Sequence, residues 1–311
     1  MNENKLTRKA LIFRAIQYAA LMIFGPVFKP LRGLFSATGG RDTIAVVTGR
    51  DISPATITAM AGAAIQALGG IDRFVRRGMT VVIKPNIGWN SPPERAHNTN
   101  PHLVEAVVRM CVQRGARVKV FDRTCNSDRL CYVNSGIRGA ARRAGADVSY
   151  MNPRKYRTVR VPEGLKQRTL KVYGDVLTAD VVINMPIAKH HSLSQLTMAM
   201  KNLMGVLGGN RGTYHSDIDK NLVDFVKAIP THLTILDATR ILTNHGPASG
   251  TLADVRETRT IVAGTNPVNV DAYGATLFGK RPSQLGYLRL AAQHGMGEIR
   301  TSRMNIIRRS V

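Results

Sequence analysis

The chain has 311 residues, of which 44% are hydrophobic, and its formal net charge is +24. The hydrophobic fraction is sufficient for one large α/β domain or two smaller ones. The three cysteines, Cys111, Cys125 and Cys131, are too few for a disulfide scaffold and lack the C-x-x-C repeats of zinc ribbons and ferredoxin-type clusters, so an intrinsic iron–sulfur cluster is not expected. Aromatic residues are only 5% and no nucleic-acid module is recognised, which argues against nucleic acid as a partner.

The first 40 residues resemble a targeting segment. Arg8 and Lys9 precede a largely apolar run, Ala15–Phe28, which is a weakened twin-arginine pattern. The run is about as long as the apolar region of a signal peptide and short for a membrane-spanning helix. Because Arg14 interrupts the run and no A-x-A site follows, an uncleaved membrane-surface helix is the alternative. We therefore expect a bacterial protein that is exported or membrane-associated, with a cytoplasmic location as the alternative.

Residues 41–300 alternate between short runs rich in Val, Ile and Thr and longer amphipathic segments. Near-continuous Val/Ile runs are typical of strands buried on both faces, and their alternation with helices predicts an α/β fold with a layered parallel or mixed sheet flanked by helices. Strands are expected at Thr43–Thr48, Thr80–Lys84, Arg117–Phe121, Asp147–Tyr150, Val181–Asn184, Leu233–Leu236 and Thr260–Ala263. Helices are expected at Ser53–Leu68, Pro101–Arg114, Gly136–Ala144, Leu193–Leu207, Lys220–Ala228, Val268–Phe278 and Ser283–His294.

One part of the chain is strongly basic. From Arg138 to Lys171 there are ten Lys and Arg residues against two acidic ones, Asp147 and Glu163. The segment Arg154–Asp175 is expected to form a small inserted β hairpin, and residues 301–311 a basic tail. A solvated basic face is the simplest interpretation, and attraction to an anionic membrane surface or an acidic ligand is the alternative.

Polar residues follow four of the predicted strands. They are Lys84-Pro85-Asn86, Asp122-Arg123-Thr124, Asn184-Met185-Pro186 and Asp237-Ala238-Thr239-Arg240. In open α/β sheets, ligands bind beyond the carboxyl ends of the strands. Although each group could be an ordinary turn or helix cap, together they predict a shared cleft at this edge of the sheet.

The segment Asn184–Gly209 contains two lysines and two histidines in otherwise apolar or small surroundings. Ser192 and Gln195 fit a capping box for the predicted helix, so His190 and His191 are expected just before its N-terminus. Uncapped N–H groups and the positive end of the helix dipole favour an anion and a neutral imidazole there. A neutral histidine can ligate a metal or accept a proton.

Within the predicted helix, Ser194, Thr197 and Lys201 are spaced to form one polar stripe, which we expect to face the cleft. The following loop, Asn210–His215, is rich in glycine and basic residues and suits a phosphate or carboxylate contact, although it is not a P-loop. The alternative is structural: Lys189 and Lys201 would form ion pairs with Asp122, Asp237 or Asp271.

Several motifs resemble the family known as domain of unknown function 362, in the family's order, between about Thr43 and Gly297. They are KPNIGW (84–89), TNPHLVEAVVRMCVQRGA (99–116), NMPIAKHHSLSQLTMAMKNLMG (184–205), HGPASG (245–250) and GTNPVNVDAYGATLFG (264–279). Many members carry ferredoxin-type modules or twin-arginine leaders, which implies a redox or membrane context. This chain lacks the ferredoxin motif, and its Thr243-Asn244-His245 stands where members often have an acidic residue, so any metal or proton role of that acid would be lost or would pass to His245.

The order His191, Lys201, His215 is also distantly similar to the N-terminal domain of nickel-pincer lactate racemases. There a lysine holds a pyridine-derived nucleotide covalently, and histidines transfer protons or ligate nickel. The likeness implies a metal or such a nucleotide as candidate cofactors here, with Lys201 as a candidate covalent anchor.

Together, the residues and the resemblance predict an enzyme that binds a small anionic ligand, carboxylate or nucleotide-like. Redox or proton-transfer chemistry is favoured over hydrolysis because no G-x-S-x-G elbow or H-E-x-x-H helix is present. The catalytic candidates are Lys201, His191 and His215, and the ligand-binding candidates are Lys84, Asn86, Lys189, His190, Thr197, Asn202, Arg211, Asp122 and Asp237. The alternative is a non-catalytic, membrane-associated binding or electron-transfer accessory protein whose basic surface holds lipid head groups or an acidic redox partner.

Overall fold

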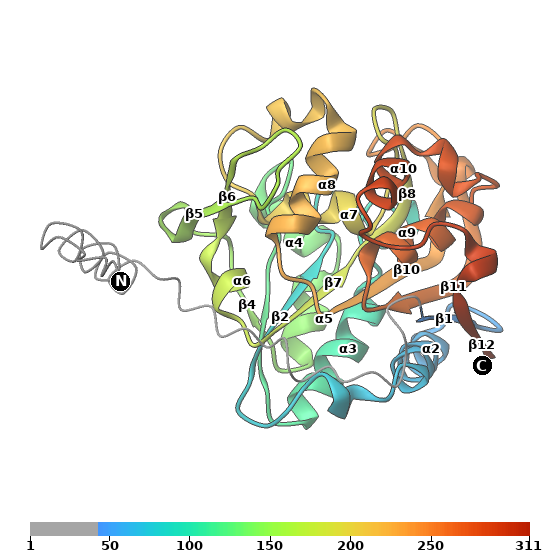
Figure 1. Ribbon diagram of the computed structural model, residues 1–311. Coiled ribbons are helices and arrows are strands. Elements are labelled where there is room, and N and C mark those ends of the chain that lie inside the picture. Colours follow the sequence, from blue (N-terminus) through green and yellow to red (C-terminus); the bar gives the residue numbers. More distant parts are fainter. Residues whose placement is uncertain (1–42) are drawn as a thin grey trace, which may run out of the picture. The chain divides into compact units, whose positions relative to one another are not determined.

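The computed structural model describes residues 43–311, so the predicted signal-like segment, residues 1–40, lies outside the described residues. A mixed sheet of ten strands forms the centre, in the order β12-β1-β11-β10-β7-β2-β3-β4, with β8 paired to β10 and β9 paired to β8 (Figure 1). The strands are β1 (Thr43–Thr48), β2 (Thr80–Pro85), β3 (Arg117–Val120), β4 (Asp147–Val148), β7 (Val181–Met185), β8 (Ile187–His191), β9 (Gln195–Thr197), β10 (Leu233–Leu242), β11 (Val255–Gly264) and β12 (Asn305–Ser310).

Helices cover both faces of this sheet. They are α2 (Pro54–Ala67), α3 (Pro101–Gln113), α4 (Asp128–Asn134), α5 (Ile137–Arg143), α6 (Gly174–Thr178), α7 (Ala199–Asn202), α8 (Ile218–Ala228), α9 (Pro267–Thr276) and α10 (Gly286–Gln293). Successive strand side chains point to opposite faces. Val81 and Ile83 pack in a core with α2, α3 and α5, whereas Val82 packs in a second core with α8, α9 and α10 (Figure 1). The predicted α/β fold with a mixed sheet flanked by helices is confirmed.

Three helices begin in the same way. Ser53, Asn100 and Asn266 each accept a hydrogen bond from a backbone N–H of the first turn, and each is followed by a proline. A short polar N-cap satisfies an otherwise unpaired donor, and proline fits the first helical position because no N–H is needed there. These local signals are the reason that the starts of α2, α3 and α9 agree with the sequence prediction to within one residue.

The helix predicted over Leu193–Leu207 is wrong. The chain instead reverses after β8 into β9, which pairs antiparallel with it and brings Lys189 opposite Thr197. Ser192 makes no cap, because the Nδ1 atom of His191 accepts the N–H groups of Leu193 and Ser194. Within residues 193–207, only the short α7 and the 3-10 turn η5 (Leu203–Val206) are helical. The polar stripe expected along one helix therefore does not exist.

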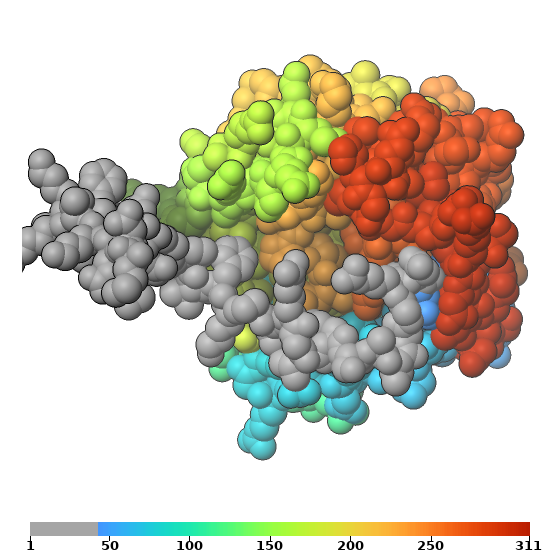
Figure 2. Space-filling model, in the orientation of Figure 1, coloured from blue at the N-terminus to red at the C-terminus, as the bar shows by residue number. Residues whose placement is uncertain are grey.

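The basic segment contains an antiparallel pair, β5 (Tyr156–Arg160) and β6 (Thr169–Tyr173), separate from the main sheet. The region around residues 150–170 (yellow-green) lies on the molecular surface (Figure 2). That this pair is an insertion stays a prediction. Residues 301–311, expected as a basic tail, include β12, which pairs in parallel with β1 along all six residues.

Within residues 43–311, no helix is both long enough and apolar enough to cross a membrane.

Candidate functional site

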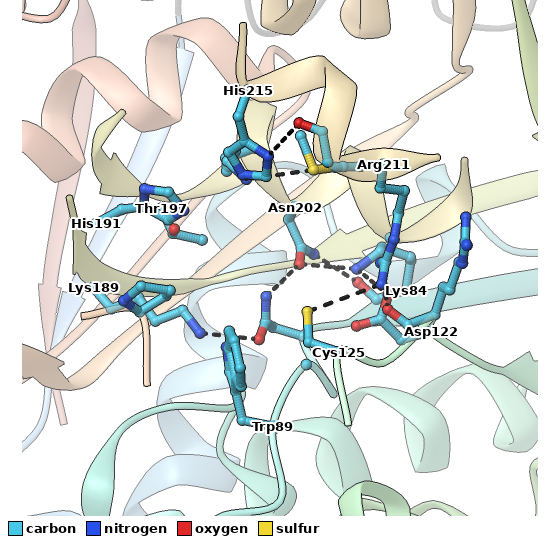
Figure 3. A pocket seen from close by; sticks show the side chains of 18 residues that line it. Lys84, Trp89, Asp122, Cys125, Lys189, His191, Thr197, Asn202, Arg211 and His215 are labelled. Carbon is cyan, nitrogen blue, oxygen red and sulfur yellow. Dashed lines mark hydrogen bonds and ion pairs between the residues drawn. The ribbon is translucent and has the colours of Figure 1, made fainter. Parts of the chain in front are cut away.

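A cavity of about 340 Å³ opens at the carboxyl ends of the parallel strands (Figure 3). β2 contributes Lys84, the turn after β3 contributes Asp122, and β8 contributes Lys189 and His191. The remaining predicted residues in its wall are Asn86, Thr197, Lys201, Asn202, Arg211 and His215. We call this cavity the Lys/His pocket. The structure thus brings ten of the twelve predicted residues to one cavity, from segments up to 131 residues apart (His215 minus Lys84).

The base of the pocket is a buried network around one ion pair. The Nζ atom of Lys84 lies 2.8 Å from Oδ1 of Asp122, and both side chains are almost fully buried. Lys84 also donates to the Oδ1 atom of Asn202 at 2.9 Å, and Asn86 donates to the same oxygen at 3.1 Å. Asn202 in turn donates to Oδ1 of Asn184 at 2.8 Å. Burial lowers the pKa of Lys84, against the opposing effect of the Asp122 carboxylate.

Lys189 is buried without a carboxylate partner. Its Nζ atom donates to the carbonyl of His97 at 2.5 Å and to Oδ1 of Asn86 at 3.3 Å. Within residues 43–311, no carboxylate oxygen lies within 4.0 Å of the Nζ atom of Lys189 or of Lys201. Burial, reinforced by the charge of Lys201, lowers the pKa of Lys189 to about 7. The structural alternative, ion pairs of Lys189 and Lys201 with Asp122, Asp237 or Asp271, is therefore wrong.

Lys201 sits beside two imidazoles. Its Nζ atom lies 3.2 Å from Nε2 of His215 and 3.4 Å from the sulfur of Met204. The His215 ring stacks on the His191 ring, with centroids 5.7 Å apart and an interplanar angle of 10°. Burial lowers the pKa of Lys201 to about 8, and burial together with the Lys201 charge lowers that of His191 to about 3. Burial and the Lys201 charge also lower the pKa of His215 below its ordinary value of 6.5. Both imidazoles are consequently neutral at pH 7, beside the Lys201 amine, whose pKa of about 8 is close to that pH.

Hydrogen bonds assign the tautomers of the two rings. The Nδ1 atom of His215 faces the carbonyl of Gly212 at 3.3 Å, and a carbonyl can only accept, so Nδ1 carries the proton. Nε2 of His215 is then the acceptor that faces Lys201. His191 has the opposite arrangement: its Nδ1 atom accepts two backbone N–H groups, so its proton is on Nε2.

The segment that carries Lys201 is held by Asp271, in α9. The two carboxylate oxygens of Asp271 accept the N–H groups of Ala199 and Met200 at 2.6 and 3.0 Å, at the start of α7. The chain packs closely at Gly205, shortly after α7. A Cβ atom on Gly205 would overlap Oδ1 of Asp122 and lie 2.6 Å from Nζ of Lys84. A residue larger than glycine would therefore displace the ion pair.

Two predicted residues lie elsewhere. Asp237 is fully buried under α3, where its carboxylate accepts the N–H of Asn100 at 2.7 Å and the hydroxyl of Thr239 at 2.7 Å. It therefore holds the N-cap of α3 in place and does not line the pocket. The Nδ1 atom of His190 accepts the N–H of Gly246, and His190 is also absent from the wall. Side chains alternate along β8, so when Lys189 and His191 face the pocket His190 faces away.

Other lining residues were not predicted. They include Trp89, Arg123, Cys125, Met204 and Pro247. Arg123 stands in the predicted strand-end group Asp122-Arg123-Thr124 but was not among the ligand-binding candidates, and Trp89 follows the end of β2 closely enough for the same argument to have included it. Arg211 reaches across this edge, and its guanidinium donates to the carbonyls of Arg123 and Thr124 at 2.6 and 2.5 Å. The exposed thiol of Cys125 lies 3.9 Å from Nη2 of Arg211.

Side chains that could ligate a metal do not cluster in the described part of the chain. No group of three or more His, Cys, Asp or Glu side chains there converges in a way that could hold a metal ion. His245, to which the role of a family acid would pass if it is not lost, is exposed and forms a 2.8 Å contact with Asp254 outside the pocket.

Residues 81–276 match the family described as domain of unknown function (DUF362). The thylakoid-associated protein sll1697 of Synechocystis sp. is 27% identical over 242 residues, which are 75% of this chain and 73% of that protein. Two solved structures are similar to the chain at a low level: a protein of Thermotoga maritima (TM-score 0.44, 11% identity, 75% of this chain) and the lactate racemase apoprotein of Thermoanaerobacterium thermosaccharolyticum (TM-score 0.39, 10% identity, 74% of this chain). The chain spans 60% and 56% of the lengths of these two structures.

The family match covers more than half of the chain and contains all of the residues that line the Lys/His pocket. The protein belongs to the DUF362 family.

Proposed function

We propose that this DUF362 member is an enzyme that binds a small anionic ligand, with a carboxylate or phosphate head, in the Lys/His pocket and moves protons there. The observation that carries the proposal is the charge of the wall. Five cationic side chains, Lys84, Arg123, Lys189, Lys201 and Arg211, line the pocket against one carboxylate, Asp122. That carboxylate already pairs with Lys84.

Buried charges without partners are costly, and removal of a partner from a buried pair costs several kcal/mol. Lys189 and Lys201 carry this desolvation cost when they are charged, because their contacts within the described residues are a carbonyl, an amide oxygen, a thioether and an imidazole. An anion between them would provide the missing counter-charge. Thr197 supports this, because its buried Oγ1 atom lines the pocket and has no hydrogen-bond partner within residues 43–311.

The proton-transfer part of the proposal depends on Lys201 and the two histidines. A general acid or base works best when its pKa lies near the operating pH, and the pKa of Lys201 is about 8. The tautomer of His215 leaves its Nε2 atom free to accept a proton from Lys201, whereas His191 presents an Nε2–H donor. A bound acid beside these groups could lose or gain a proton next to its carboxylate, with Lys189 stabilising the developing negative charge.

The test uses exchange of carbon-bound hydrogen. The protein is incubated in D2O with gluconate or lactate, and loss of the signal of the hydrogen next to the carboxylate is followed by NMR. Wild type should exchange it, whereas Lys201→Met and His215→Gln should each slow exchange by at least about a hundredfold. Lys220→Met is the control, because Lys220 is exposed and paired with Asp217. Equal exchange in all four proteins would refute the catalytic role.

No step in this proposal passes through a metal or a pyridine-derived nucleotide. If such a nucleotide is used, the cationic wall would suit its phosphate, and Lys201 is the amine for a covalent anchor. Intact-mass measurement of protein from its native host tests this, because an adduct that disappears in Lys201→Met would support it.

A second candidate function is a non-catalytic, membrane-associated binding or electron-transfer accessory protein. The name of the thylakoid-associated relative favours it. The exposed Arg157 and Arg160 on β5, and the exposed Arg154 in the turn before it, favour it as well. Sedimentation with phosphatidylglycerol vesicles would test it. Replacement of these three residues by glutamine in the full chain should abolish co-sedimentation, and unchanged co-sedimentation would exclude this surface as the contact.

A further inference from the structure

A second cavity, of about 490 Å³, lies beside the Lys/His pocket. Its wall comes from the turn after β3, the strand pair β5–β6 and the glycines that follow η5. The polar and aromatic residues of its lining include Asp122, Arg123, Asn126, Asp128, Tyr156, Thr158 and Lys171. We call it the hairpin cavity.

The two cavities meet at Asp122 and Arg123, which line both. The Nη1 atom of Arg123 donates to the carbonyls of Leu207 and Gly209, each at 2.9 Å, which fixes the guanidinium at the junction. Its Nε and Nη2 groups donate no hydrogen bond to any residue of the described part of the chain. Arg123 therefore offers donors to a ligand that reaches from one cavity into the other.

The chemistry of the hairpin cavity differs from that of the Lys/His pocket. Cations dominate the Lys/His pocket, whereas the hairpin cavity mixes hydroxyl, amide and carboxylate groups, from Thr158, Asn126 and Asp128, with Lys171 and the ring of Tyr156. Carboxylate and amide oxygens accept hydrogen bonds from ligand hydroxyls, and hydroxyl and ammonium groups donate to them. A wall that offers both donors and acceptors beside a ring suits a polyhydroxylated chain or sugar.

We propose that the two cavities together hold one elongated ligand, a sugar acid or sugar phosphate. Its carboxylate or phosphate head lies among the lysines of the Lys/His pocket, and its hydroxylated tail crosses Arg123 into the hairpin cavity. This inference rests on the proposed anion binding, to which it adds the ligand class and a second subsite. Short acids would fill the first subsite alone.

The experiment compares long and short ligands with the same head group. Dissociation constants of the full-length protein are measured by titration calorimetry for gluconate against lactate, and for glucose 6-phosphate against inorganic phosphate. Comparison of the two pairs shows whether the head group is a carboxylate or a phosphate. The ratio of the two dissociation constants within each pair measures how much the hydroxylated tail adds to the affinity. Wild type should bind at least one long ligand about tenfold more tightly than its short counterpart.

Thr158→Phe places a ring in the hairpin cavity without touching the Lys/His pocket. Thr169→Phe is the matched control, because Thr169 is an exposed threonine of the same strand pair that lines neither cavity. Thr158→Phe should remove the tenfold preference for the long ligand and leave the short ligand unchanged, and Thr169→Phe should alter neither. Lys171→Met, which removes a polar group from the same wall, should reduce the preference in the same direction.

The outcomes separate the two proposals. If wild type binds the short ligands but binds the long ligands no more tightly, the two-subsite proposal is overturned and anion binding stands. The same holds if the preference of wild type for the long ligand persists in both Thr158→Phe and Lys171→Met. Absence of binding by all four ligands would overturn both.

Discussion

The Nζ atom of Lys84 lies 2.8 Å from Oδ1 of Asp122, and this ion pair takes up the single carboxylate in the wall of the Lys/His pocket. Lys189 and Lys201 are held nearby in the same cavity without an acidic partner within the described residues. The pair therefore divides the lysines into one that is neutralised by the fold and two that are available to a ligand.

Anion affinity should fall as the pH rises. Lys189 and Lys201 titrate with pKa values of about 7 and about 8, so each loses its charge between pH 6 and pH 9. Linkage predicts that affinity falls by about tenfold per pH unit for each proton that the bound state requires. Calorimetric titration of gluconate at pH 6, 7.5 and 9 measures this slope. In Lys201→Met the slope should be shallower, and an identical slope would exclude Lys201 as the titrating group.

Replacement of Lys189 by methionine should stabilise the protein while it abolishes binding. The folded-state pKa of Lys189, about 7, is lower than the value of about 10.4 expected in the unfolded chain. The unfolded state therefore binds more protons between pH 7 and about 10, and the Lys189 contribution to stability rises with pH over that window. At pH 7 the buried amine is a cost, so Lys189→Met should raise the free energy of unfolding by about 1–3 kcal/mol.

Urea denaturation at pH 7 and pH 9.5 checks this, with Lys220→Met as the exposed control. Wild type should gain stability between the two pH values by more than Lys189→Met does. A destabilised Lys189→Met protein would show that the lysine is structural, in contrast to the trade-off between stability and function expected at a binding site.

Thr197→Val should separate ligand binding from folding. The hydroxyl of Thr197 is buried in the pocket wall, and that of Thr234 is buried in β10. Neither has a hydrogen-bond partner within residues 43–311. Replacement of such a hydroxyl by a methyl group should stabilise the protein by about 0.5–2 kcal/mol in both Thr197→Val and Thr234→Val. Only Thr197→Val should weaken anion binding. If the two variants bind alike, the Thr197 hydroxyl does not contact the ligand.

Gly205→Ala should disrupt the base of the pocket. The added methyl group would overlap Oδ1 of Asp122, so the Lys84–Asp122 pair must shift. We expect a loss of about 1–3 kcal/mol in stability, together with loss of binding. Gly62→Ala is the control, because the nearest atom to its Cβ would be 3.9 Å away and alanine favours a helix. Thermal unfolding compares the two, and equal midpoints would contradict the close packing at Gly205.

The strand pattern and the strand-end argument accounted for Lys84, Asn86, Asp122 and Arg123, whereas the other predicted pocket residues came from the Lys/His segment and the loop after it. The strands that carry Lys84 and Asn184 were predicted closely, because buried Val/Ile runs and turn residues are local signals. The reversal at His191 was missed because it depends on side-chain hydrogen bonds to the N–H groups of Leu193 and Ser194, and because apolar residues on both sides of it fit a helix as well as a strand.

Asp237 was misplaced for a related reason. A carboxylate after a strand can face a ligand or cap a neighbouring helix, and the bond from Asn100, 137 residues away in the chain, decides which. The absence of acidic partners for Lys189 and Lys201 in the described structure is likewise a tertiary property, because the acids of the chain are spread over its whole length.

The central claim is that Lys201 forms part of an anion site, and titration calorimetry of gluconate and glucose 6-phosphate at pH 6.5 tests it most directly. Wild type and Lys220→Met should bind at least one of the two with the same affinity, and Lys201→Met should bind it at least about tenfold more weakly. Equal affinity in the three proteins, or no binding by wild type, would contradict the account.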